Sequence, residues 1–188
     1  MNYKILPMDI ECYPNYLLIG IKDTRGQYHL IDSPEGLDFF FPYLDNIVFA
    51  GYNSVNYDSV ILDYVLTYYK TKSWDRIVKD CHKLTVNLIE KGHSRFQIRS
   101  SWNIEPLSNH LDLIFYNMNM GLKELGIRMH HDLLDTLPID PTKELTPDEI
   151  QTIRKYNMND LDITEKLLNE VQSRQVEAKR NLIDSFEL

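Results

Sequence analysis

The first thirty residues carry short runs in which hydrophobic and polar positions alternate, as they do along β-strands with one buried face. Residues 4–10 form one such run, and within residues 16–22 apolar side chains recur at every second position. A turn sequence at residues 23–26 is followed by a third run at residues 27–31. The pattern predicts three successive antiparallel strands.

Helical spacing begins after these strands. Ser33 and Pro34 match an N-cap and a first helical position, and the helix that they open is expected to bury four apolar side chains. These are Leu37, Phe40, Phe41 and Leu44. A continuous apolar run at residues 46–52 then predicts a strand that is covered on both faces.

The rest of the chain alternates predicted helices with short strands. The expected elements are helices over residues 58–66, 73–89 and 121–129 (the last with Leu122, Leu125 and Ile127 turned inward), an excursion or short strand over 95–101, and a strand over 111–115. After a loop at residues 137–144, Thr146 and Glu149 form a capping box around Pro147. We expect the helix that starts there to continue to the C-terminus.

This order of elements indicates an α/β fold with a mixed central sheet, in which the first three strands are antiparallel, the later strands are parallel, and helices flank the sheet. The chain has 188 residues, 43% of them hydrophobic, which suits a single domain 1–188 with a core of about 4–170 and a C-terminal helical extension at 171–188.

The chain contains no apolar run long enough to cross a bilayer and begins without a signal-peptide core. We therefore expect no membrane partner and a cytoplasmic location. The two cysteines, Cys12 and Cys81, lie far apart and match no metal-binding pattern, so reduced thiols are expected.

Charge is unevenly distributed along the chain. The formal net charge is −8, yet residues 70–99, the basic segment, sum to +5 while the rest sums to −13. The basic residues of the segment are Lys70, Lys72, Arg76, Lys79, Lys83, Lys91, Arg95 and Arg99. This distribution suits a protein that binds a polyanion on one side and carries an acidic, cation-binding site on the other. It equally suits a solvated, lysine-rich helical face.

Two carboxylates, Asp9 and Glu11, are two residues apart at the end of the first predicted strand. Side chains at this spacing point to the same face of a strand, and two anions so close repel each other unless a cation lies between them. Oxygen ligands in this arrangement favour a hard divalent ion. The alternative is a pair of exposed acids at a strand end.

Three further residues extend this pattern. Asp58 follows the strand at 46–52 and opens a helix, where it fits either a ligand-binding edge of the sheet or a routine N-cap. Tyr156 and Asp160 are four residues apart and so share one face of a helix. That pair is equally compatible with a structural hydrogen bond.

Taken together and in order, these motifs resemble those of the DEDD superfamily of 3′–5′ exonucleases, in its tyrosine branch. The matching residues are Asp9-Ile10-Glu11, the segment from Asn53 to Tyr57-Asp58, Tyr156 to Asp160, and the intervening Leu111-Asp112-Leu113 and Gly121 to Gly126. The histidine branch has His one position before the tyrosine, where this chain has Lys155. The likeness is strongest to proofreading domains of phage-type DNA polymerases.

The resemblance implies a ribonuclease H-like fold and hydrolysis of a terminal phosphodiester by two divalent ions, Mg²⁺ or Mn²⁺, about 4 Å apart. It implies that Asp9 bridges the ions, that Glu11 and Asp160 complete one site, and that Asp58 supports the other. A phenol titrates near pH 10, so Tyr156 is better suited to orienting the attacking water than to deprotonating it.

The implied substrate is the 3′ end of single-stranded DNA, released as nucleoside 5′-monophosphates. Proofreading is one use of this activity, a polymerase domain or subunit is one implied partner, and the location is the host cytoplasm if the chain is phage-encoded. Contacts to the substrate are expected from Cys12, Tyr13, Leu17, Asn53 and Tyr57. Trp74, Phe96 and Trp102 are further candidates for base contacts, or else core residues. Cys12 stands where many relatives have Thr, so the contact that the resemblance implies for it is through the main chain and not through a hydroxyl.

Neighbouring His130 and His131 diverge too far to chelate one ion, and Asp162 is expected to face solvent, away from Asp160. Two other functions fit the same residues. One is a 3′–5′ exonuclease acting on RNA or oligoribonucleotides. The other is a catalytically idle module that binds nucleic acid or a polymerase.

Overall fold

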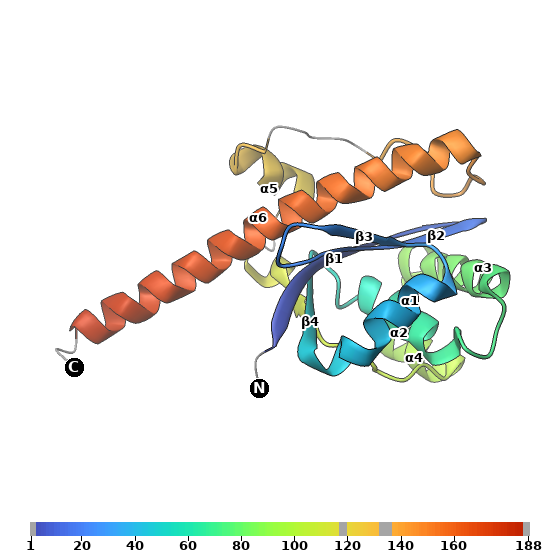
Figure 1. Cartoon of the computed structure of the whole chain (residues 1–188), viewed down its shortest axis with the longest axis horizontal. Coiled ribbons are helices and arrows are strands. Elements are labelled where there is room, and N and C mark those ends of the chain that lie inside the picture. Colours follow the sequence, from blue (N-terminus) through green and yellow to red (C-terminus); the bar gives the residue numbers. More distant parts are fainter. Residues whose placement is uncertain (1–2, 117–119, 132–136, 186–188) are drawn as a thin grey trace.

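A five-stranded mixed sheet forms the centre of the molecule in the computed structural model. The structure describes residues 3–116, 120–131 and 137–185, and it describes their side chains except those of residues 116 and 175–185. The strands are β1 (Lys4–Tyr13), β2 (Tyr16–Lys22), β3 (Tyr28–Ile31), β4 (Ile47–Gly51) and β5 (His110–Asp112), in the order β3-β2-β1-β4-β5 (Figure 1). The first three are antiparallel, and β4 and β5 run parallel to β1. The predicted α/β class and mixed sheet are confirmed.

Strand β1 is longer than the sequence pattern predicted, and this decides where its carboxylates lie. Its pairing with β2 continues to Tyr13, whereas its pairing with β4 covers only Lys4 to Pro7. Beyond Pro7, β1 therefore has a neighbour on one edge only. Asp9 and Glu11 lie inside the strand, where the sheet opens, and not at its end.

Helices α1 to α4 cover one face of the sheet. They are α1 (Pro34–Phe40), α2 (Asp58–Tyr68), α3 (Trp74–Thr85) and α4 (Arg95–Trp102), with the 3₁₀ segment η1 (Phe41–Asn46) and the π-helical segment η2 (Val86–Glu90) between them (Figure 1). The even-numbered side chains of β1, such as Met8 and Ile10, pack here against α2 and α3 in the main core. Both cysteines are free and buried in this core.

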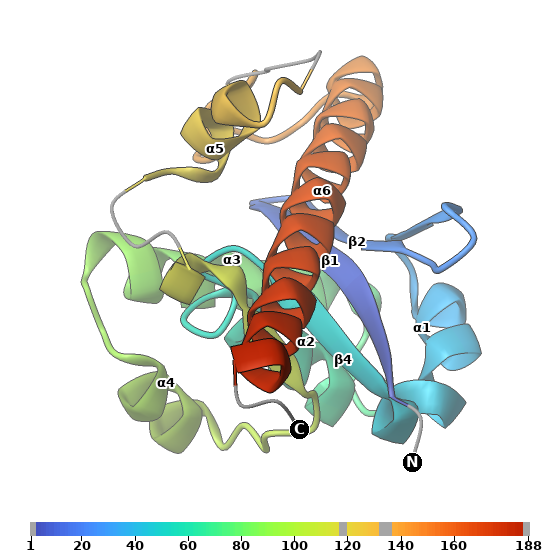
Figure 2. The ribbon, with the colours of Figure 1, turned by 90° about the vertical axis from the view of Figure 1, so that its left-hand side faces the viewer.

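The other face of the sheet carries α5 (Leu122–Arg128) and the long helix α6 (Pro147–Ser185), while the 3₁₀ segment η3 (Leu113–Tyr116) follows β5. Figure 2 shows α6 lying across the strands with α5 beside it, and Figure 1 shows the C-terminal half of α6 extending beyond the sheet. The predicted capping box is confirmed, since Glu149 accepts hydrogen bonds from the backbone N–H and the hydroxyl of Thr146, both at 2.7 Å.

Two predicted elements were wrong in type or extent. Residues 95–101 are helical because Ser94 and Gln97 form a capping box, with each side chain bonded to the other's backbone. The predicted strand 111–115 ends at Asp112, whose carboxylate accepts the backbone N–H of Ile114 and turns the chain.

Two side chains predicted to be buried are exposed. Phe41 is 42% exposed because Pro42 lacks the N–H that a continuing α-helix needs, and the chain tightens into a 3₁₀ turn. Ile127 is 58% exposed, since Leu125 and Gly126 form the inward side of α5. None of the described helices combines the length and the apolar content that crossing a bilayer requires.

Candidate metal and nucleic-acid site

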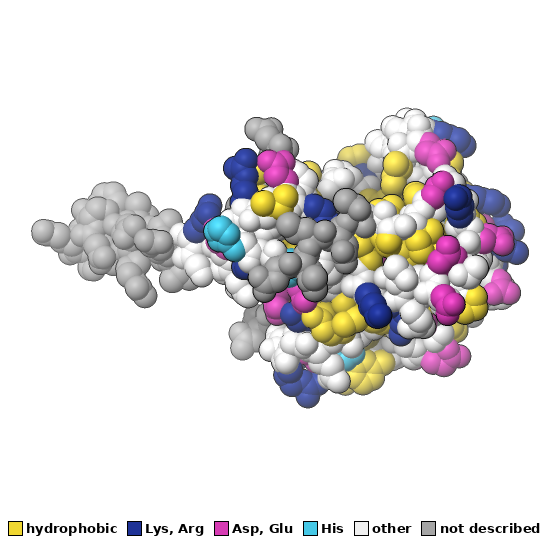
Figure 3. Space-filling view, turned by 90° about the horizontal axis from the view of Figure 1, so that it is seen from above, with side chains coloured by type: hydrophobic (Ala, Val, Ile, Leu, Met, Phe, Trp, Pro, Cys, Tyr) yellow, Lys and Arg dark blue, Asp and Glu magenta, His cyan; other side chains and the backbone are white. Residues whose placement is uncertain are grey.

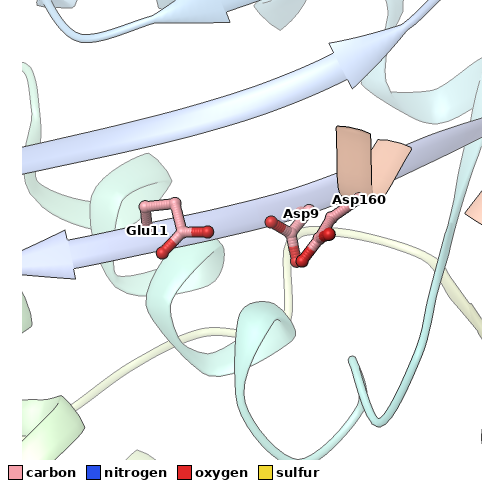
Figure 4. A group of neighbouring side chains, drawn as sticks. All are labelled: Asp9, Glu11 and Asp160. Carbon is pink, nitrogen blue, oxygen red and sulfur yellow. The ribbon is translucent and has the colours of Figure 1, made fainter. Parts of the chain in front are cut away.

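Three carboxylates from two elements meet on the α6 side of the sheet. Asp9 and Glu11 project from β1, and Asp160 projects towards Asp9 from α6 (Figure 4). Each offers an oxygen atom, and these three atoms lie within 4.8 Å of one another. Glu11 is 9% exposed and Asp160 6%. We call these three residues the acidic cluster, a grouping with the geometry of a site for a metal ion.

A cleft of about 300 Å³ opens at this cluster. Its lining consists of Asp9, Ile10, Glu11, Tyr52, Asn53, Tyr57, Asp58, Ile89, Leu137, Tyr156 and Asp160. The structure thus brings together all five residues that the sequence assigned to catalysis, from three separate elements.

Asp58, the first residue of α2, contacts β1 directly. Its Oδ1 accepts the backbone N–H of Ile10 at 3.0 Å, at a point where β4 no longer pairs with β1. The N-cap position of α2 belongs to Tyr57, so the alternative that Asp58 is a routine N-cap is wrong. The fourth carboxylate is instead held at the opening of the sheet, beside the acidic cluster.

Burial makes the charges of this site costly. It is the main cause that raises the pKa of Asp9 from 3.8 to about 6, against the opposing effects of the Lys123 charge and a hydrogen bond from Asn157. Burial, followed by the charge of Asp9, raises the pKa values of Glu11 and Asp58 well above their usual range. The protein supplies fewer positive charges here than negative ones, which favours a bound cation.

Lys123 of α5 is the cation nearest to the cluster among the described residues. Its ammonium group contacts Oδ1 of Asp160, and it lies 4.2 Å from the centroid of the Tyr156 ring. The sequence alone does not single out this lysine. It falls in the segment Gly121 to Gly126, which was noted only for its resemblance, and no local pattern shows that α5 packs near α6.

Asn157 of α6 was also missed. Its side chain is fully buried, and its Nδ2 donates to Oδ2 of Asp9 at 2.8 Å and to the backbone oxygen of Asp9 at 3.2 Å. The sequence signal for this residue is weak. An asparagine beside a proposed catalytic tyrosine, in a polar helical segment, does not by itself indicate a contact with a distant carboxylate.

The residues expected to contact a substrate divide into two groups. Asn53 and Tyr57 line the cleft. The side chains of Cys12, Tyr13 and Leu17 are 5%, 1% and 0% exposed and pack in the core, so the expectation of side-chain contacts from Tyr13 and Leu17 is corrected. Their positions on tightly paired β1 and β2 explain this burial. The contact expected from Cys12 is through its main chain, which the burial of its side chain does not test.

Exposed apolar side chains at the cleft come from residues that the sequence analysis did not select. Ile89 of η2 is 66% exposed and Leu137 is 43% exposed, and both line the cleft. Of the three other aromatic candidates, Trp74 and Trp102 are packed against the core, whereas Phe96 is 70% exposed on α4.

Four of the eight basic side chains of the basic segment form ion pairs with carboxylates of the protein itself. Lys70 pairs with Asp38, Lys72 and Arg76 pair with Asp80, and Arg99 pairs with Asp63. The exposed Lys79, Lys83 and Lys91 have no such carboxylate partner among the described residues. Arg95 lies 4.8 Å from the Phe96 ring centroid and 3.5 Å from the backbone oxygen of Val55, in the loop that carries Asn53 and Tyr57.

On the face covered by α5 and α6, basic and acidic side chains are interspersed (Figure 3). Asp162 faces away from Asp160 as predicted, but it does not end in solvent. It accepts hydrogen bonds from Lys22 and Tyr28 and so fastens α6 to the sheet. His130 is exposed, and His131 hydrogen bonds Asn159.

Comparison of the chain with protein-family models, with curated proteins and with solved structures finds no match in any of the three.

Proposed function

We propose that this chain is a metal-dependent 3′–5′ exonuclease of the DEDD type with a ribonuclease H-like fold. The observation that carries the proposal is that one carboxylate oxygen each of Asp9, Glu11 and Asp160 lie within 4.8 Å of one another, in a cleft that Asp58 also lines. The sheet supports it, because three antiparallel strands followed by two parallel ones are what the resemblance implies.

The residues present fit divalent cations. Mg²⁺ and Mn²⁺ prefer carboxylate oxygens, and the four carboxylates that line the cleft leave an excess of negative charge over Lys123, the lysine that contacts them among the described residues. Asp9, Glu11, Asp58 and Asp160 would hold the ions. Bound there, the ions would bring a water towards deprotonation and offset the negative charge that develops on the phosphate.

The remaining cleft residues suit the other tasks of hydrolysis. The Tyr156 hydroxyl orients the attacking water, which gives up a proton to solvent as its oxygen joins the phosphorus and the bond from phosphorus to the 3′ oxygen breaks. The departing 3′ oxygen takes up a proton from solvent. The terminal nucleoside packs against Ile89 and Leu137, and Asn53 supplies a polar contact. Tyr57 contributes its ring and not its hydroxyl, which is bonded to Thr85 at 3.0 Å.

The basic segment gives the upstream strand a path away from the acidic cluster. Lys91, Arg95 and Phe96 follow Ile89 closely in sequence, so cations and an exposed ring continue from the apolar side of the cleft. Phosphate contacts and base stacking are the two components of sequence-independent single-strand binding. This arrangement supports a single-stranded nucleic acid as the substrate, and the resemblance to proofreading domains of DNA polymerases favours DNA.

A direct test incubates the purified chain with matched single-stranded DNA and RNA, with Mg²⁺, with Mn²⁺ or with EDTA. We expect release of nucleoside 5′-monophosphates from DNA that requires the metal. Faster release from RNA would replace DNA with RNA as the substrate. Binding of the oligonucleotides without release from either would instead identify an idle binding module.

A further inference from the structure

We infer that Asn157 is a positioning residue for Asp9, and that Gly20 provides the space that this role requires. The inference rests on the proposed metal site, though not on the exonuclease reaction. Asn157 is fully buried between α6 and the sheet, and its Nδ2 bonds both the carboxylate and the backbone oxygen of Asp9. The two bonds together fix the direction of the Asp9 side chain relative to its own strand.

Gly20 lies directly opposite Asp9 in the β1–β2 ladder. A Cβ atom at this position would lie 1.8 Å from Oδ1 of Asn157 and 2.8 Å from its Cγ. Any side chain there would displace the amide from Asp9. The glycine is therefore needed for space at this position.

The Asn157 amide does not have the environment of a group retained for stability. Its Oδ1 is buried and has no hydrogen-bond partner, which is unfavourable in a protein interior. An apolar side chain at this position would avoid that cost. What Asn157 contributes instead is the pair of bonds to Asp9.

A neutral donor suits this position better than a charged one. Asp9 faces Glu11 and Asp160, whose charges repel it. A lysine or arginine would hold Asp9 in place but would neutralise the charge that attracts a cation. An amide holds the carboxylate in the cluster and leaves its charge available to a metal ion.

The test is Mn²⁺ binding, measured by titration calorimetry on the full chain. We expect Asn157→Ala to weaken Mn²⁺ affinity by about 10- to 100-fold, the range typical of partners that orient metal ligands. Asn159→Ala is the matched control, because Asn159 is a buried asparagine of the same helix that bonds His131 and not the cluster. That control is expected to bind Mn²⁺ as the wild type does.

Gly20→Ala provides a second, independent variant. It should weaken Mn²⁺ binding to a similar extent, and the double variant Gly20→Ala/Asn157→Ala should bind no worse than Asn157→Ala alone, because both changes remove the same interaction. The double variant also relieves the clash if Gly20→Ala alone fails to fold.

Three results would overturn the inference, and they are distinguishable. Unchanged Mn²⁺ affinity in Asn157→Ala, with binding intact in the wild type, removes the positioning role and leaves the proposed function standing. Additive losses in the double variant show that the two residues act separately. Absence of Mn²⁺ binding by the wild type removes the metal site and the positioning role together.

Discussion

Oδ1 of Asp58 accepts the backbone N–H of Ile10 at 3.0 Å, and so takes the place that a neighbouring strand would occupy on the open edge of β1. One carboxylate therefore serves two purposes. It satisfies a buried backbone donor in the sheet, and it adds a fourth negative group to a cleft lined by Asp9, Glu11 and Asp160. The structure of the sheet and the composition of the site are linked through this contact.

This double role gives the first prediction. Asp58→Ala leaves the Ile10 N–H without its acceptor and should lower the free energy of unfolding by about 1–3 kcal/mol. Asp58→Asn retains an acceptor oxygen and should keep most of the stability, while both variants weaken Mn²⁺ binding. Urea unfolding and calorimetry measure the two effects. Equal destabilisation by both substitutions would show that the hydrogen bond is not what Asp58 contributes to folding.

The sequence predicted this site better than it predicted the surroundings of the site. Spacing alone placed Asp9 with Glu11 and Tyr156 with Asp160, because the periods of strands and helices are local properties. It did not reveal that β1 continues past β4, and so it placed Asp9 at a strand end. Contacts between distant segments decide such details.

The same limit explains the residues that were missed. Lys123 and Asn157 acquire their roles only when α5 and α6 pack beside β1, and neither has a distinctive neighbour in sequence. The burial of Tyr13 and Leu17 likewise follows from tertiary packing on both faces of the β1–β2 hairpin. By contrast, the Ser94–Gln97 capping box is a local sequence signal, and it favours the helix that residues 95–101 form over the predicted excursion or strand.

The second prediction concerns pH. The pKa of Asp9 is about 6 in the folded protein against an ordinary 3.8, so the folded chain holds its proton more readily than the unfolded chain. This group therefore contributes most to stability below about pH 4 in the metal-free protein, and its contribution is lost as pH rises through about 6. Metal binding has the opposite dependence, because an ion must displace the proton.

Thermal unfolding with excess Mn²⁺ and with EDTA, at several values between pH 5 and pH 8, measures this dependence. The difference between the unfolding temperature with Mn²⁺ and that with EDTA should widen as pH rises. Taking this difference at each pH cancels the effect of groups that titrate elsewhere in the chain. In Asp9→Asn the difference should vary less with pH. A difference that is constant across the range in the wild type would contradict the account.

A third prediction separates strand binding from hydrolysis. Lys91→Ala/Arg95→Ala should weaken binding of a long single-stranded oligonucleotide. The slope of the logarithm of the binding constant against the logarithm of the salt concentration should become shallower by about 0.7 for each phosphate contact that is lost. Hydrolysis of a dinucleotide should be unchanged, since it does not reach these residues. Lys70→Ala is the matched control within the basic segment, because Lys70 is already paired with Asp38 at 2.8 Å. Equal losses in the control would assign the effect to net charge alone.

The exposed ring of Phe96 gives a fourth prediction. Phe96→Ala should reduce the binding free energy of the long oligonucleotide by about 1–3 kcal/mol if a base stacks on the ring. Fluorescence anisotropy with a labelled oligonucleotide measures this change. Phe39→Ala, which removes a ring 63% exposed on α1, should leave affinity unchanged. Wild-type affinity in Phe96→Ala would place the strand elsewhere.

The central claim is that the acidic cluster hydrolyses nucleic acid from the 3′ end. The most direct measurement follows a 5′-labelled single-stranded DNA on a denaturing gel, with wild type and Asp9→Ala in Mg²⁺. The wild type should shorten the labelled strand one nucleotide at a time. Asp9→Ala should still bind the strand, but its rate of shortening should fall by more than about 100-fold. That loss exceeds what residues that only orient metal ligands usually contribute. Shortening by Asp9→Ala at the wild-type rate, or no shortening by a wild type that binds both metal and strand, would contradict the claim.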